Sequence, residues 1–271
     1  MQGDVFLGTQ GWNYSAWVGP FYPVGTRSGD MLGTYAKAFS TVEVDSTFYA
    51  VPPEPVVAGW DKRTPDGFVF SLKVPQEITH ERRLVDCSRP LGKFLKRVSA
   101  LGPKLGVLLL QMAPDWEPTP VNQEALKRFL PQLPEGYRFA VEFRHPAWLE
   151  PGVVDQLRER NVALTLADGR WIRRDVMLDL AEDPTADFSY IRWMGPDRAI
   201  TDYSRVQADR TEDLTLWSAG VRALASRVRT VYGYFNNHYQ GHSPATARQL
   251  QRLLGQEPVP PETLREQMEL L

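Results

Sequence analysis

The chain has 271 residues, and 42% of them are hydrophobic, which is enough for one large domain with a sizeable core. A net charge of −2 and a sequence pI of about 6.1 exclude the global basic field of a general nucleic-acid binder, although they leave room for a local basic groove. The single cysteine, Cys87, excludes a disulfide framework and a cysteine-based zinc site. Because the sequence has neither a signal-peptide pattern nor a long apolar run, we expect a cytoplasmic protein without a membrane partner.

Apolar runs that end in polar or proline-containing turns alternate along the chain with segments of helical periodicity. The predicted strands are Val5–Trp12 with its exit turn, Val42–Tyr49, Phe68–Val74, Leu105–Met112, Arg138–Arg144, Ala163–Ala167, Phe188–Trp193 and Val231–Asn236. The predicted helices are Met31–Phe39, Glu54–Lys62, Leu91–Leu101, Asn122–Leu130, Val153–Arg160, Thr211–Arg227 and Pro244–Leu254. Residues 168–187 are the least regular part, and the pattern does not place the helix of this unit well.

Strands that alternate with helices imply a parallel sheet, and eight such units in one chain predict a closed (β/α)₈ TIM-type barrel. Since no change in composition marks a boundary, we expect one domain over residues 1–271. The alternative is an open doubly wound sheet. The absence of a glycine-rich phosphate motif after any strand counts against it.

Alternation along the predicted strands selects the side chains that face the barrel interior, because successive residues point to opposite faces. Polar residues on the inward face at the carboxyl ends of strands line the mouth of a barrel, where active sites lie. This rule selects four acids, three bases and two amides, which are Glu43, Asp45, Glu142, Asp168, Lys73, Arg144, Arg192, Gln111 and Asn236. A cluster of mixed charge is therefore predicted at the mouth, with the orientation of Asp168 left open.

Seven motifs resemble the YecE-like family, catalogued as domain of unknown function 72. They are Gly8–Trp12, Gly19–Pro23, Val42–Tyr49, Phe70–Pro75 with Ile78–His80, Leu109–Pro114, Ala140–Trp148 and Tyr234–His238. The resemblance runs in order along nearly the whole chain and implies a TIM-type barrel, but no particular reaction. Asp45 is a departure, because the family pattern more often has asparagine there. The family's binding site in turn resembles that of metal-dependent DNA-repair barrels, which implies nucleic acid as a ligand.

The first hypothesis is an anion-binding site. Lys73, Arg144 and Arg192 converge on the predicted mouth, where they would hold a phosphate or a carboxylate. Glu43 and Glu142 are the candidates for acid–base catalysis. Gln111 and Asn236 would orient the ligand. The alternative for the same charges is an internal salt-bridge network, which is an inefficient source of stability because burial removes each ion from water.

Aromatic residues in or beside the loops after the strands form a second feature, with Trp12, Tyr49, Trp148 and Trp193 as the candidates for ligand contact. Aromatic faces near cations are suited to stacking against nucleobases or sugars. For any one of these tryptophans, ordinary packing over the barrel is the competing interpretation.

No cofactor is predicted. His145 and His238, together with the mouth carboxylates, are the only candidates for a divalent metal, and no histidine pair has the spacing of a metal motif. A turn-capping role is the simpler interpretation of His145.

The preferred function is binding of a phosphate-containing ligand, either an anionic small molecule or nucleic acid, with phosphate-ester hydrolysis as the reaction if the protein is an enzyme. One alternative is a carbohydrate-active hydrolase or isomerase that uses Glu43 and Glu142. The large retaining barrel families place their carboxylate pair after the fourth and seventh strands, where this chain has Gln111 and Arg192. The other alternative is a non-enzymatic binding module. The sequence carries no signal for an oligomeric state.

Overall fold

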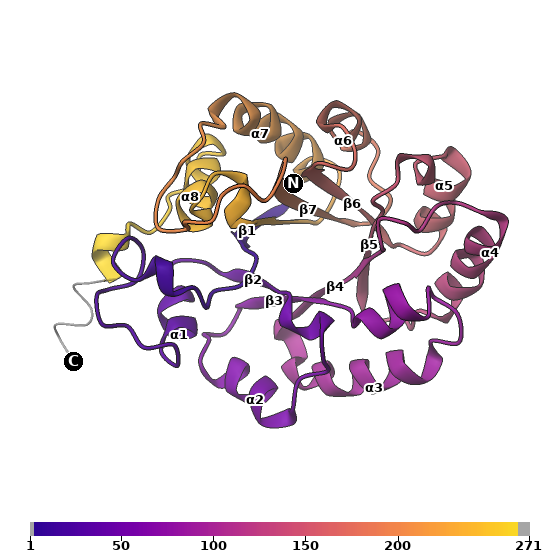
Figure 1. The fold of residues 1–271 in the computed structure, drawn as a ribbon, viewed down its shortest axis with the longest axis horizontal. Helices are drawn as coiled ribbons and strands as arrows, with labels where there is room; N and C mark the ends of the chain where they lie inside the picture. The colour runs from indigo at the N-terminus through magenta and orange to yellow at the C-terminus, as the bar shows by residue number, and fades with distance from the viewer. Residues whose placement is uncertain (1–2, 265–271) are drawn as a thin grey trace.

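The computed structural model describes residues 3–264 and forms a barrel of eight parallel strands surrounded by helices (Figure 1). The strands are β1 Asp4–Thr9, β2 Thr41–Val44, β3 Val69–Lys73, β4 Leu105–Gln111, β5 Arg138–Glu142, β6 Ala163–Gly169, β7 Phe188–Gly195 and β8 Thr230–Phe235. The helices are α1 Met31–Tyr35, α2 Glu54–Lys62, α3 Ser88–Val98, α4 Pro120–Phe129, α5 Pro151–Glu159, α6 Arg174–Leu180, α7 Thr211–Ala225 and α8 Ser243–Leu253. The predicted TIM-type barrel is confirmed.

Parallel pairing runs from β1 through β8, β7, β6, β5, β4 and β3 to β2. The seam between β1 and β2 is closed differently. A single bridge pairs Gln10 with Glu43, and the amide of Gly11 donates to the carbonyl of Glu43 at 2.8 Å. Farther down the seam the hydroxyl of Tyr35 accepts from the Thr9 amide and donates to the Thr41 carbonyl, each at 3.0 Å. A side chain from α1 thus satisfies backbone groups that strand pairing leaves free.

Two cores follow from the alternation of side chains. The larger lies between the strands and the surrounding helices, and the smaller fills the barrel interior with Val107, Leu109, Ala140, Ala163, Phe188, Tyr190, Tyr232 and Tyr234. Tyr234 ends the interior core with a polar contact, since its hydroxyl lies 2.7 Å from Thr41 Oγ1 and 2.8 Å from Ser71 Oγ. Above this layer the inward side chains become charged.

One local prediction is wrong, and one helix lies where the sequence pattern gives no clear bounds. The strand expected over Val42–Tyr49 ends at Val44, because Asp45 has right-handed helical backbone angles and a 3₁₀ helix follows over Ser46–Phe48. The irregular region after β6 contains the seven-residue helix α6. Its single fully buried side chain, Met177, is too little for a helical period to be visible in the sequence.

No helix in the described part of the chain combines the length and the apolar character needed to cross a membrane. The prediction of one domain over residues 1–271 extends beyond the described residues and stays a prediction.

Removal of the Tyr35 hydroxyl tests how the seam is closed. We expect Tyr35→Phe to lower the free energy of unfolding by about 2–4 kcal/mol, because it leaves a buried amide and a buried carbonyl without a partner. Tyr49→Phe is the matched control, since Tyr49 is 74% exposed, and should change stability by less than about 0.5 kcal/mol. Urea denaturation followed by circular dichroism measures both. Equal stabilities of the two variants would contradict this account of the seam.

Candidate functional site

The centre of the barrel mouth is one buried arginine held between two buried glutamates. Arg192 extends inward from β7, and its Nε and Nη2 atoms donate to the carboxylate of Glu43 on β2 at 3.0 and 2.8 Å. Its Nη1 atom donates to Glu142 at the end of β5 at 2.6 Å. All three residues are at most 1% exposed. We call Glu43, Glu142, Arg192 and the adjoining Arg144 the Arg192 network.

The two glutamates of the network differ in acidity. Burial raises the pKa of Glu43 to about 6, in spite of the opposing charge of Arg192. Burial also acts to raise the pKa of Glu142, but the charges of Arg192 and Arg144 outweigh it and lower this pKa to about 2. Glu142 accepts charge-assisted hydrogen bonds from two guanidinium groups, those of Arg144 and Arg192. Glu43 accepts from one guanidinium group, that of Arg192, and from the Tyr190 hydroxyl at 2.6 Å. The difference in pKa follows from the number of cations that each carboxylate contacts.

The prediction that Arg192 binds an anionic ligand is wrong, because the side chain is buried between two carboxylates. The guanidinium is 1% exposed, and Glu43 and Glu142 occupy its donors. The alternation rule placed the side chain correctly, yet the partners that it also placed there neutralise the charge. Asp45 lies at the edge of the network, with a half-exposed side chain and an Oδ1 atom 3.5 Å from Arg192 Nη2.

Arg144 joins the buried network to the open part of the mouth. Its Nε atom donates to Glu142 at 3.0 Å, and its Nη2 atom donates to the side-chain oxygen of Gln111 at 2.7 Å. Its guanidinium carbon also lies 5.8 Å from the centroid of the Trp171 ring. The side chain stays 15% exposed, so Arg144 is the most exposed member of the network, and it lines a pocket together with Glu142.

Lys73 lies on the other side of the mouth, at the end of β3. Its Nζ atom lies 3.8 Å from the ring centroid of Phe48, and the backbone carbonyl of Lys73 accepts from the Thr47 hydroxyl at 2.6 Å. Burial and the charge of Arg192 lower the pKa of Lys73 to about 8. His80 packs edge-on against the same Phe48 ring, with 4.9 Å between ring centroids.

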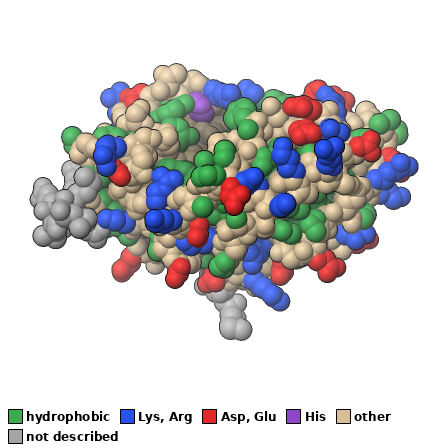
Figure 2. Space-filling view, turned by 90° about the horizontal axis from the view of Figure 1, so that it is seen from below, with side chains coloured by type: hydrophobic (Ala, Val, Ile, Leu, Met, Phe, Trp, Pro, Cys, Tyr) green, Lys and Arg blue, Asp and Glu red, His purple; other side chains and the backbone are tan. Residues whose placement is uncertain are grey.

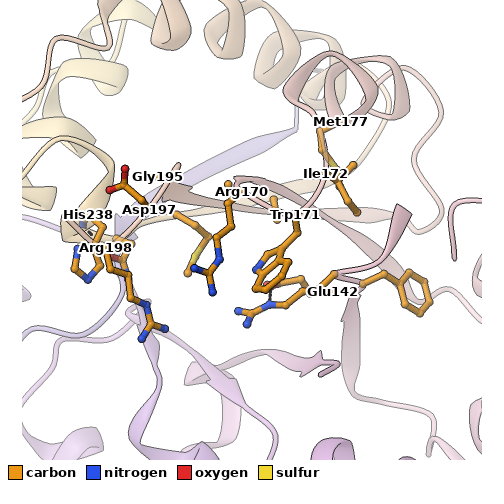
Figure 3. Close-up of a pocket in the computed structure, with 15 residues that line it drawn as sticks. Glu142, Arg170, Trp171, Ile172, Met177, Gly195, Asp197, Arg198 and His238 are labelled. Carbon is orange, nitrogen blue, oxygen red and sulfur yellow. Dashed lines mark hydrogen bonds and ion pairs between the residues drawn. The ribbon is translucent and has the colours of Figure 1, made fainter. Parts of the chain in front are cut away.

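The open pocket lies over the ends of β5 to β8 (Figure 3). Arg144 and Glu142 line it from β5, Arg170 and Trp171 from the loop after β6, and Arg198 from the loop after β7. Figure 3 shows Arg170, Trp171 and Arg198 extending into the same open space. The guanidinium carbon of Arg170 lies 4.3 Å from the Trp171 ring centroid, and Trp171 is 37% exposed.

The loops after β7 and β8 approach each other closely at the floor of this pocket. Gly195 has a φ of +84°, and a Cβ atom there would lie 2.5 Å from the His238 carbonyl oxygen. Only glycine fits such a position without a shift of the backbone. The contact sets Asn236 and His238 against the end of β7, and both line the pocket.

The predicted residues at the end of β8 are fixed by hydrogen bonds. Asn236 donates to the side-chain oxygen of the buried Gln10 at 2.8 Å and accepts from the amide of His238 at 2.9 Å. The Nε2 atom of His238 lies 3.2 Å from the Tyr203 hydroxyl. Burial lowers the pKa of His238, so its imidazole is neutral at physiological pH.

The expected aromatic cover differs from the one observed. Trp148 and Trp193 are fully buried, so their prediction as ligand contacts is wrong. Trp148 stacks on Trp116 in the layer between strands and helices. Trp193 follows the inward Arg192 and therefore faces the helices, where it stacks on Phe235, while Gly233 leaves room for its ring.

The remaining predicted aromatic residues occupy the rim or its underside. Trp12 is partly buried and packs edge-on against Trp60 and Phe70. Tyr49 is exposed and lies edge-on to Phe48. Neither lines the pocket over β5 to β8.

The side chains of Asp168 and His145 hold local structure in place through hydrogen bonds. Asp168 accepts from Arg174, Trp217 and Tyr239 at 2.8, 2.7 and 3.0 Å, so it faces the helices and lies outside the mouth cluster. An irregularity in the pairing of β6 with β7 falls immediately after it, between Asp168 and Gly169. His145 accepts from the Ala147 amide at 3.3 Å, in the turn-capping role expected of it.

Sequence reasoning missed the pocket residues Arg170, Trp171 and Arg198, because they belong to loops that no strand or helix period places. The sequence does carry one signal, an arginine and a tryptophan directly after the Asp168–Gly169 strand end. Among residues 3–264, no group of three or more His, Cys, Asp or Glu side chains is arranged to hold a metal ion.

Substitution of the two glutamates tests the unequal roles inferred from their pKa values. At pH 7 we expect Glu142→Gln to destabilise the protein by about 3–5 kcal/mol, because it breaks a buried ion pair. Glu43→Gln should cost less, since the fold already raises the pKa of Glu43. That raised pKa contributes stability below about pH 4.5 that is lost as the pH rises through about 6. Denaturant titrations at several pH values measure both variants.

The sign is opposite for Glu142. Its lowered pKa contributes stability above about pH 4.5 that is lost as the pH falls towards about 2. The stability difference between wild type and Glu142→Gln should therefore narrow at acidic pH. An equal cost for the two variants at pH 7 would contradict the assignment.

Comparison with known proteins identifies relatives along almost the whole chain. Residues 6–268 match the model of the family described as "Protein of unknown function DUF72". The UPF0759 protein YecE of Escherichia coli K12 is 29% identical over 253 residues, which cover 86% of each chain. The UPF0759 protein YunF of Bacillus subtilis is 26% identical and covers 92% of this chain and 94% of its own.

Solved structures agree with this relationship. The crystal structure of a DUF72 family protein from Thermotoga maritima has a TM-score of 0.79 and 25% identity, and the match covers 93% of this chain and all of the other. A psychrophilic endo-β-1,4-xylanase of glycoside hydrolase family 10 has a TM-score of 0.50 and 9% identity, with 92% and 96% covered, which shows a shared fold alone. The motifs, the family match and the structural similarity agree, and the chain belongs to the DUF72, or YecE-like, family.

Proposed function

We propose that this protein binds a phosphate-containing ligand, of nucleotide or single-stranded nucleic-acid type, in the pocket over β5 to β8. One observation carries the proposal, which is that Arg144, Arg170 and Arg198 line this pocket together with the half-exposed Trp171. The buried Arg192, which was the centre of the predicted anion site, supports the floor and does not contact the ligand.

The charge of the pocket favours an anion. Among the described residues, no carboxylate forms an ion pair with Arg170 or Arg198, in contrast to Arg192 and Arg144. Asp197 also lines the pocket and is the acidic group that a ligand would have to avoid. Guanidinium groups bind phosphate through paired, charge-assisted hydrogen bonds, which are stronger than neutral ones.

The surroundings suit a local site better than a general nucleic-acid surface. Figure 2 shows acidic and basic side chains interspersed over the face in view, in keeping with the net charge of −2. The loops after strands 7 and 8 are a frequent phosphate-binding position in TIM barrels, and here they supply Arg198 and His238 to the pocket, next to Gly195 at the end of β7. The ring of Trp171 offers a face for stacking of a base.

Single arginine variants test the proposal. We expect Arg170→Ala and Arg198→Ala each to weaken binding of ATP, measured by calorimetry, by about tenfold, because each removes charge-assisted hydrogen bonds to phosphate. Arg173→Ala is the matched control. Its side chain is exposed, pairs with Asp175 and does not line the pocket, so its affinity should equal that of wild type.

A second probe separates the two ligand types. Binding of a fluorescein-labelled oligothymidine, measured by anisotropy across salt concentrations, should weaken in the same two variants, and the salt slope should fall by about 0.7 for each lost phosphate contact. Binding of ATP alone would assign a nucleotide-sized ligand. If neither probe binds, or if both variants bind as tightly as Arg173→Ala, the proposal fails.

A carbohydrate-active hydrolase or isomerase is the second candidate, and the separation of the pKa values of Glu43 and Glu142 favours it. Against it, Arg192 contacts both carboxylates and Glu43 is 0% exposed. Hydrolysis of an aryl glycoside that is lost in both Glu43→Gln and Glu142→Gln would support this candidate. Ligand binding without turnover would instead identify a binding module.

A further inference from the structure

We infer that Lys73 is a nucleophilic amine that forms an imine with an aldehyde or ketone at the mouth of the barrel. This site lies at the end of β3, beside Phe48 and His80, and it is not part of the pocket over β5 to β8. The inference therefore extends beyond the proposed phosphate binding and does not depend on it.

The position of the amine argues against a purely structural role. A structural lysine in this protein is illustrated by Lys104, whose Nζ atom forms an ion pair with Asp61 and donates to the carbonyl of Thr64. Within residues 3–264, Lys73 Nζ has no such hydrogen bond or ion pair, and it lies 3.8 Å from the centroid of the Phe48 ring. A contact with a ring face favours the protonated amine, but it leaves Nζ without a hydrogen-bonding partner among the described residues, so the amine is open to a reactant.

Burial favours the neutral form of Lys73. Together with the charges of Arg192 and Arg144, burial outweighs Asp45 and Glu142, which act to keep the amine protonated, so the pKa falls to about 8. Neutral amine is the nucleophilic form, and desolvation next to other cations is how enzymes activate lysine. At pH 7 a group with this pKa is about one-tenth neutral, hundreds of times more than an ordinary lysine.

His80 packs against the same Phe48 ring as a neutral group. Burial and the charge of Lys73 lower its pKa to about 4, so the imidazole is neutral at physiological pH. Its Nδ1 atom lies 2.9 Å from the Thr79 hydroxyl, which fixes the orientation of the ring. An imidazole with a pKa this low is a weak base, so water, and not His80, takes the proton that the attacking amine releases.

The reaction balances without an added oxidant or reductant. The lone pair of Lys73 Nζ attacks the carbonyl carbon, the carbonyl oxygen takes up a proton, and the nitrogen gives a proton to water. The resulting carbinolamine loses its hydroxyl group, with a proton, as water. The products are the imine on Lys73 and one water molecule, and the imine activates the neighbouring carbon of the substrate.

Reductive trapping tests the inference on the full chain. The folded protein is incubated at pH 7 with glyceraldehyde and sodium cyanoborohydride, and labelled lysines are located by peptide mass spectrometry. We expect the label to enter Lys73 at least about tenfold faster than the exposed Lys93, with an apparent pKa near 8 for the Lys73 reaction. Lys73→Arg keeps the positive charge and should lose this fast label while Lys93 reacts as before. Thermal unfolding establishes that the variant is folded.

Comparable labelling of Lys73 and Lys93 in the folded wild type would overturn the inference. A parallel experiment with glyceraldehyde 3-phosphate distinguishes the Lys73 site from the proposed phosphate site. Faster trapping of the phosphorylated aldehyde that inorganic phosphate or Arg198→Ala reverses would join the two sites. Selective labelling of Lys73 by both aldehydes at equal rates would leave the amine site standing without support for a joint substrate.

Discussion

The structure depends on a guanidinium that is almost completely buried. Arg192 carries a full charge into the top of the barrel, and that charge is tolerable because Glu43 and Glu142 contact it from opposite ends of the group. Burial acts to lower the pKa of Arg192, but the two glutamates outweigh it and hold the pKa well above its ordinary value. Three strands far apart in the sequence, β2, β5 and β7, are thereby joined at the level of the mouth.

This internal neutralisation determines where chemistry is available. A closed ion pair offers little to a ligand, so the groups that remain open lie around it, with Arg170 and Arg198 over one side and Lys73 on the other. Arg144 belongs to both levels, since it contacts Glu142 below and lines the pocket above. The network therefore supplies a fixed, electrically balanced base beneath the two sites that we propose, one for anions and one for a carbonyl group.

Much of the barrel and of its charged interior could be predicted from the sequence, because both rest on periods that are local. The two-residue period of β5 and β7 correctly turned Glu142 and Arg192 inward. The same period puts Trp193 on the opposite face, against the helices, which its prediction as a ligand contact overlooked. Loop residues follow no such period. Arg170, Trp171 and Arg198 are placed by tertiary contacts of the loops after β6 and β7, and the irregular pairing next to Asp168 ends the alternation there.

Glu43 has one role through its backbone and another through its side chain. Its backbone carbonyl accepts the bond from Gly11 that closes the seam between β1 and β2, and its carboxylate holds Arg192. The continuity of the barrel wall and the electrostatic state of its interior thus meet in one residue. Protonation of Glu43 therefore takes place beside the seam between β1 and β2, which strand pairing closes with a single bridge. The protonation state of this carboxylate and the stability of the barrel are thermodynamically coupled.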